Sequence, residues 1–327
     1  MRVHVSAPDV VPSPLELFRR SAEPHADRAI RQGRWVVVTR GVYADAGAWH
    51  ALAPWDRYLA RVHAAAARHP DAIFVRESAA ALRGLPVFGE PRDVHVVAGP
   101  AATARVVSGT RVHIAERLPQ HEELGGLLVA APLEIAVDLA RHHHHAVGLA
   151  GACSVLRHHH DVDVAAMRSL NLARRSSRGR RHAAWVFDRA TGVPESTLEV
   201  VSLAVIEWLG FPVPELQQRF NGETVEDDLR LDYWWQAARI GGEADGDAKY
   251  AGMDAATMLR ARRVRDARLL ERGVAATVHW GWYEATHVAP LRAALIAAGL
   301  RPERPEDTAE LRSLTRLLAP GSRAPRS

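Results

Sequence analysis

The sequence predicts a mixed α/β (α+β) protein with more than one domain, and three observations lead to this prediction. The chain has 327 residues, roughly twice the size of a typical domain of ~150 residues. Its hydrophobic fraction of 47% and charged fraction of 24% are typical of globular proteins. After residue 195 the sequence reads as helix, three strands, helix and strand, the order of a mixed α/β core.

The composition argues against a membrane protein and against a disulfide-stabilised one. Residues 1–16 lack the apolar core of a secretory signal, and no apolar run approaches the ~20 residues of a membrane helix. Cys153 is the only cysteine in the sequence, so no intramolecular disulfide can form. We therefore expect a cytoplasmic protein with no membrane partner.

The positive charge is carried almost entirely by arginine. The net charge is +4 and the sequence pI is about 9.7, and this bias alone does not indicate nucleic acid as a partner. Lys249 is the only lysine. A lysine in such a background is a candidate for a role that needs a compact ammonium group with a tunable pKa, which arginine cannot supply.

Residues 1–48 read as a winged-helix-like unit that binds DNA. Helices are predicted over 15–21 and 25–33, the second closed by Gly33, and a hairpin over 35–43 turns at Arg40 and Gly41. Such a helix and wing commonly contact phosphates. A solvated basic helix face beside a hairpin fits the same spacing equally well. The candidate DNA-binding residues are Arg28, Arg31, Arg34 and Arg40.

Residues 49–190 are predicted to form a middle α/β domain. Helices are expected over 55–69, 77–85 and 132–142, and strands over 93–99 and 110–116. The histidine runs 142–145 and 158–160 do not indicate a metal site, because adjacent histidines on a helix point in different directions. The basic segment 172–182 is either a solvated flank or a nucleic-acid contact.

Residues 191–327 are predicted to form a third domain with the order αβββαβ, followed by C-terminal helices. The first helix spans 195–211 and the second spans 255–273. The strands are expected over 215–221, 229–236, 238–245 and 274–282.

Carboxylates gather in this last domain. Asp232 is expected at the end of one strand, and Glu243 and Asp245 lie two apart on the next strand, hence on one face. Hard oxygen ligands of this kind hold Mg²⁺ for phosphodiester hydrolysis. We expect Asp232, Glu243 and Asp245 to bind Mg²⁺, Lys249 to stabilise charge, and Glu199 to support the site from the first helix. The alternative interpretation is a solvated acidic hairpin tip.

The sequence resembles the AbiEi-like antitoxin family of actinobacterial proteins, joined to a nuclease-like domain related to very-short-patch-repair endonucleases and the PD-(D/E)XK group. The resemblance covers most of the chain and is sharper after residue 195. The matching segments in the nuclease-like part are 196–199, Gln217, 231–233, 243–246, 249–250, 265–269 and 278–280. Those in the antitoxin-like part, residues 16–188, are 40–43, 77–80 and 138–141.

The resemblance implies two competing classes of function. One is a Mg²⁺-dependent DNA endonuclease that uses Glu199, Asp232, Glu243, Asp245 and Lys249. The other is a binding protein, an antitoxin or repressor with a cognate toxin as partner and a degenerate nuclease fold. One departure bears on the choice: the usual lysine two residues after the second acid is replaced here by Asp245, so its role falls to Lys249 or is lost.

Overall fold

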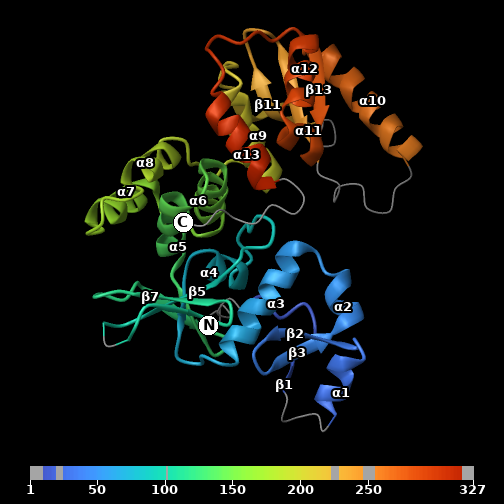
Figure 1. The fold of residues 1–327 in the computed structure, drawn as a ribbon. Coiled ribbons are helices and arrows are strands. Elements are labelled where there is room, and N and C mark those ends of the chain that lie inside the picture. Colours follow the sequence, from blue (N-terminus) through green and yellow to red (C-terminus); the bar gives the residue numbers. More distant parts are fainter. Residues whose placement is uncertain (1–9, 20–24, 101, 222–227, 246–254, 319–327) are drawn as a thin grey trace, which may run out of the picture. The chain divides into compact units, whose positions relative to one another are not determined.

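The computed structural model describes residues 10–19, 25–100, 102–221, 228–245 and 255–318 and confirms the mixed α/β class (Figure 1). These residues form 13 helices and three sheets. They divide into two compact units between Arg189 and Ala190. We call the described residues 10–189 the N-terminal unit and 190–318 the C-terminal unit.

The N-terminal unit begins with a small three-stranded sheet in the order β1-β3-β2, with both pairings antiparallel. The hairpin between β2 and β3 turns at Gly41, whose φ of +82° is accessible to glycine at little cost. Helix α2 starts after Asp45, whose side chain accepts a hydrogen bond from Ala48 N. The elements are β1 (Phe18–Arg19), α1 (Ala26–Arg31), β2 (Trp35–Thr39), β3 (Val42–Asp45) and α2 (Ala46–Ala51).

The helix predicted over 15–21 is wrong in its described part. Residues 15–17 are not helical, and Phe18 and Arg19 form strand β1 beside Tyr43 and Val42. The Phe18 ring stacks on Trp35 at a centroid distance of 5.1 Å. This contact with a distant residue outweighs the local helical pattern.

A six-stranded mixed sheet forms the centre of the N-terminal unit, in the order β6-β7-β5-β4-β9-β8. Helix α3 (Pro54–Ala66) and helix α4 (Arg76–Leu82) pack against β5. Buried Tyr58 fixes α3 to α4, because its hydroxyl lies 2.7 Å from Ser78 Oγ. The strands are β4 (Ile73–Phe74), β5 (Val94–Ala98), β6 (Arg105–Val107), β7 (Thr110–Ile114), β8 (His121–Leu124) and β9 (Leu127–Ala130).

The helices that follow this sheet pack on one another at close range. A Cβ atom on Gly148 would lie 2.8 Å from Ala140 Cα, and one on Gly151 would lie 2.6 Å from a methyl group of Leu139. Glycine at these two positions therefore allows α5 and α6 to touch. The helices are α5 (Pro132–His142), α6 (His145–His158), α7 (Val164–Ala173) and α8 (Arg180–Phe187).

The C-terminal unit contains a four-stranded sheet in the order β10-β11-β12-β13, in which only the β12–β13 pair among these strands is parallel. The helices and strands follow the predicted order of helix, three strands, helix and strand, with three helices after them. They are α9 (Thr197–Trp208), β10 (Glu215–Phe220), β11 (Leu229–Trp235), β12 (Ile240–Ala244), α10 (Ala255–Glu271), β13 (Ala276–Trp280), α11 (Trp282–His287), α12 (Ala289–Ala298) and α13 (Thr308–Leu318).

Helices α9 and α10 both pack on this sheet. On the α9 side, Trp280 Nε1 donates to Ser202 Oγ at 2.8 Å and Tyr233 Oη donates to the Glu199 carbonyl at 2.6 Å. Towards α10, an apolar cluster joins the sheet to the helix and to the loop after it. Its members are Leu229, Leu231, Trp234, Leu269 and Val274.

Among the described residues, none of the helices combines the length and apolarity needed to cross a lipid bilayer.

Candidate functional site

The centre of the candidate site is Gln217, which links two buried carboxylates. Its Nε2 donates to Glu199 Oε2 at 2.8 Å and to Asp232 Oδ1 at 3.1 Å. Glu199 and Asp232 are each 5% exposed. Glu199 is held in the first turn of α9, where Ser196 caps the helix by accepting from Glu199 N. The side-chain amide thus brings together acids from α9 and β11.

Asp232 lies in the middle of β11, which corrects the prediction that it ends the strand. Its Oδ2 accepts a hydrogen bond from Ala244 N at 2.9 Å. The carboxylate therefore reaches across to β12, the strand that carries Glu243. This contact keeps one oxygen of Asp232 at the β11–β12 boundary and the other at Gln217.

Burial raises the pKa of Glu243 to about 7, because its 3% exposed carboxyl group is poorly solvated. The nearby charges of Asp232 and Asp245 raise it further, and Arg265 opposes them. Burial also raises the pKa of Glu199, and Asp232 adds to this shift. The charge of Asp232 therefore disfavours the ionised forms of both Glu199 and Glu243.

Two arginines on helix α10 form ion pairs with Glu243 and Asp245. Arg265 Nη2 lies 2.7 Å from Glu243 Oε1, and Arg262 Nη2 lies 2.7 Å from Asp245 Oδ2. Arg265 also donates to the Arg230 carbonyl of β11. Positions 262 and 265 are one turn apart on the helix, so both side chains reach the same edge of the sheet.

His279 on β13 completes the network. Its Nδ1 lies 2.9 Å from Asp245 Oδ2 and its Nε2 lies 3.0 Å from Asp266 Oδ1. Burial lowers the pKa of His279, but the hydrogen bonds with both carboxylates outweigh it and the net shift is upward. His279 lies beside Glu243 because the two residues are paired in the parallel register of β12 and β13.

The structure therefore groups the predicted site residues unequally. Gln217 joins Glu199 and Asp232, and Glu243 lies near Asp232, whereas Asp245 is bound by Arg262 and His279. Lys249 lies outside the described residues. Within the described ranges, no group of three or more His, Cys, Asp or Glu side chains is arranged to hold a metal ion.

Several members of this network were not predicted as site residues. Gln217, Arg265, Asp266 and His279 appeared only in segments that carry the family resemblance, and Arg262 appeared in none of them. The positions 262, 265 and 266 are spaced i, i+3 and i+4, which places them on one helix face. That spacing was the available signal, but it does not reveal which acids the face meets.

The four predicted DNA-binding arginines are all exposed in the N-terminal unit. Arg28 and Arg31 lie on α1, Arg34 lies just before β2, and Arg40 lies at the tip of the β2–β3 hairpin. Arg34 Nε donates to Gln32 Oε1 at 3.2 Å. Their side chains are thus accessible to a polyanion.

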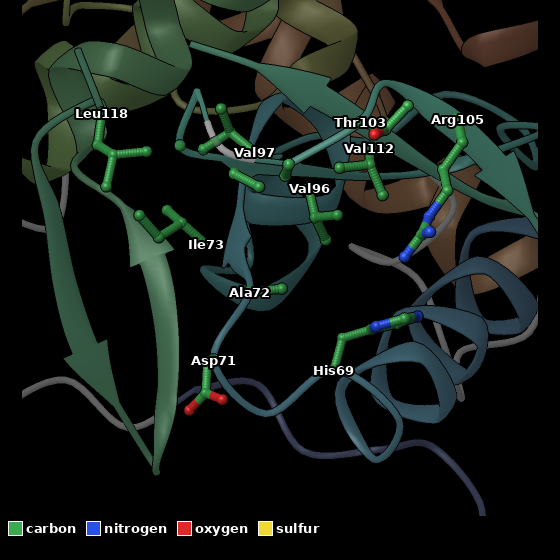
Figure 2. Close-up of a pocket in the computed structure, with 13 residues that line it drawn as sticks. His69, Asp71, Ala72, Ile73, Val96, Val97, Thr103, Arg105, Val112 and Leu118 are labelled. Carbon is green, nitrogen blue, oxygen red and sulfur yellow. The ribbon is translucent and has the colours of Figure 1, made fainter. Parts of the chain in front are cut away.

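A separate hollow of about 280 Å³ lies in the N-terminal unit and contains none of the predicted site residues. Figure 2 shows its lining, which comes from the segment between α3 and β4, from strands β4 to β7 and from the segments that follow β5 and β7. Its polar lining residues include His69, Asp71 and Arg105, and within the described part of the chain no hydrogen bond or ion pair joins these three side chains to one another. The lining is mainly apolar, with side chains such as Ile73, Val96, Val97, Val112 and Leu118.

No family model matches this chain, and no curated protein is significantly similar to it.

Proposed function

We propose that the C-terminal unit binds a divalent cation such as Mg²⁺ and hydrolyses phosphodiester bonds in DNA. The observation that carries the proposal is that buried Asp232 on β11 lies near two other buried acids, Glu199 on α9 and Glu243 on β12. Burial, and to a lesser extent the charge of Asp232, raises the pKa values of Glu199 and Glu243, and a bound cation would stabilise the ionised carboxylates.

The donor set fits a hard cation. Carboxylate oxygens are the ligands that Mg²⁺ prefers, usually with several waters retained. In addition, Gln217 Oε1 is buried and has no hydrogen-bond partner among the residues that the structure describes, which is costly for an amide oxygen. Asp232 and Glu243 would hold the ion, with Glu199 and the Gln217 oxygen next to them.

The chemistry requires a water, a base and a cation. A bound Mg²⁺ supplies Lewis acidity toward a phosphoryl oxygen. Glu199, whose pKa is raised by burial and which would lie beside the ion, would accept a proton from the attacking water. The water oxygen forms a bond to phosphorus, the bond from phosphorus to the leaving oxygen breaks, and that oxygen takes a proton from solvent. The Arg265 side chain is 40% exposed, so it can leave its ion pair with Glu243 and bind a phosphate oxygen instead.

A second function, DNA binding without hydrolysis, is favoured by the arginines on α10. Arg265 and Arg262 form ion pairs with Glu243 and Asp245 and so compensate carboxylates that a metal site would need. With the lysine of the usual motif replaced by Asp245, this arrangement suits a nuclease fold that serves an antitoxin or repressor, whose protein partner would be a toxin. Both functions involve DNA, which supports a cytoplasmic location.

Nicking of supercoiled plasmid by the full chain separates the two functions. We expect nicking with Mg²⁺ or Mn²⁺, none with EDTA, and none for Asp232→Asn. The matched control is Glu303→Gln, an exposed carboxylate outside the site, which should nick like the native chain. DNA binding without any metal-dependent nicking by the native chain would establish the second function instead.

Arg265→Ala tests whether the arginine competes with the cation. Removing it leaves Glu243 without its ion-pair partner, so the cation has no competitor for that carboxylate. We expect the melting temperature to rise more with Mn²⁺ in Arg265→Ala than in the native chain. An equal response in both proteins would show that Glu243 takes no part in cation binding.

A further inference from the structure

The hollow in the N-terminal unit has no place in the function proposed above. Its volume is about 280 Å³, close to the lower end of the ~300–1,000 Å³ typical of small-molecule pockets. Ile73, Val96 and Val97 line it and are buried in the sheet. Leu118 also lines it, although this side chain is 42% exposed. The hollow therefore offers an apolar surface to a small molecule.

The register of the sheet places a cation beside this apolar surface. Arg105 on β6 lies directly opposite Val112 on β7, and Val112 pairs in turn with Val96 on β5. Side chains of residues paired in this way point to the same face of a sheet. All three residues line the hollow. The Arg105 side chain therefore leaves the sheet on the same face as two of the valines that a ligand would cover.

Arg105 is not paired with an acid in the described part of the chain. Its guanidinium group forms no hydrogen bond or ion pair with any residue that the structure describes. Asp71 is the one acidic residue among the described residues that line the hollow, and Figure 2 shows its carboxylate directed away from Arg105. The planar guanidinium group is thus free to bind a carboxylate through two parallel N–H donors.

His69 adds a second polar group to the hollow. Figure 2 shows the side chains of His69 and Arg105 pointing toward one another, the first from the segment after α3 and the second from β6. The His69 ring forms no hydrogen bond or ion pair within the described ranges. Burial lowers the pKa of His69, and the charges of Arg68 and Arg105 lower it further. The imidazole is therefore neutral at pH 7 and can donate one N–H without adding a second charge.

We propose that this hollow binds a small carboxylic acid with an apolar body. The carboxylate pairs with Arg105 and accepts an N–H from His69, and the apolar body covers Ile73, Val96 and Val97. Arg105 is the one arginine among the described residues that line the hollow. A single cation beside a neutral imidazole matches a single negative charge, whereas a phosphate group carries nearly two charges and calls for more cations.

Calorimetric titration of the full chain with octanoate tests this site, beside octanamide and acetate. Octanamide keeps the apolar chain and removes the charge, and acetate keeps the charge and removes most of the chain. We expect saturable binding of octanoate to one site, at least about tenfold tighter than the binding of either analogue, because both the charged pair and the apolar contact contribute. Absence of saturable octanoate binding, or equally tight binding of octanamide, overturns the proposal. Tighter binding of octyl phosphate than of octanoate also overturns it, in favour of a phosphate monoester.

Arg105→Gln tests the polar part of the site. Arg105 is exposed, so the variant should fold. We expect it to bind octanoate at least about tenfold more weakly than the native chain and to bind octanamide as the native chain does. Arg92→Gln, an exposed arginine outside the lining, is the matched control and should keep the native affinity for octanoate. Equal weakening in both variants would mean that octanoate responds only to the overall charge, which overturns the site.

Ala98→Leu tests the apolar part. Ala98 lines the hollow and lies two residues from Val96 on β5, on the same face of the sheet, so a larger side chain takes the place of the ligand. We expect octanoate binding to be lost in this variant, with a melting temperature that shows the chain to be folded. In the native chain, octanoate should raise the pKa of His69 measured by NMR, because a bound carboxylate favours the imidazolium form. Native octanoate affinity in a folded Ala98→Leu chain, or an unchanged His69 pKa, places the ligand elsewhere and overturns the proposal.

Discussion

At the scale of single residues, burial favours the protonated form of two acidic side chains in the C-terminal unit, Glu199 and Glu243. The pKa of Glu243 is about 7 in the folded chain and about 4.5 when exposed. The folded state therefore binds more protons than the unfolded state between these values, and the stability from Glu243 is lost as the pH rises through about 7. We expect the free energy of unfolding to fall by about 3 kcal/mol across this window because of this group.

Glu243→Gln should flatten this pH dependence, since an amide does not titrate. The measurement is urea unfolding of the full chain, followed by tryptophan fluorescence from about pH 4.5 to 8. Glu199 and His279, whose pKa values are also raised, contribute with the same sign and remain in the variant. Glu303→Gln is the control and should keep the native slope. An unchanged slope in Glu243→Gln would mean that Glu243 titrates normally.

The acids of the candidate site could be predicted from the sequence, but their partners could not. The acids Asp232 and Glu243 could be picked out by type and spacing. Their partners Arg265 and Gln217 could not be assigned, because those contacts depend on how α10 and β10 lie against β11 and β12. Lys249 lies outside the described residues, so its predicted role stays a prediction.

At the scale of elements, helices and strands with strong local sequence patterns were predicted correctly. Elements that depend on contacts between distant residues were not. Helix α5 was predicted over 132–142 and is found at Pro132–His142, since proline suits the first turn of a helix and an apolar stripe follows it. Strands β10 to β13 were likewise predicted, over ranges that extend at most two residues beyond either end of the strands found. Strand β1 was missed because its pairing with β3 and the stacking of Phe18 on Trp35 involve residues distant in sequence.

The contact between α5 and α6 gives a prediction at this scale. Gly148→Ala places a methyl group 2.8 Å from Ala140 Cα, which is backbone and cannot rotate away. The helices must separate, and we expect a loss of about 1 to 3 kcal/mol of stability, typical of overpacking. Thermal unfolding of the variant measures this loss. Gly99→Ala is the matched control, because no atom lies within 4 Å of the added methyl group, and its melting temperature should be nearly native.

At the scale of the whole molecule, the net charge of +4 is small, so the proposed DNA binding would depend on where arginines are exposed. Arg28, Arg31, Arg34 and Arg40 are exposed on the small sheet and its helix. Each arginine that contacts a phosphate releases counterions and steepens the fall of affinity with salt by about one unit of the log–log slope. The full chain should therefore bind duplex DNA with an affinity that drops sharply as salt rises.

The quadruple variant, with all four arginines changed to glutamine, should bind more weakly and with a slope smaller by up to about four units. Fluorescence anisotropy with a labelled duplex, over a series of salt concentrations, measures both quantities. Arg181→Gln, an exposed arginine on α8, should leave the slope unchanged. If the quadruple variant keeps the native slope, these arginines form only a solvated basic surface. DNA binding would then have to come from another cationic surface, such as exposed Arg260 and Arg263 on α10.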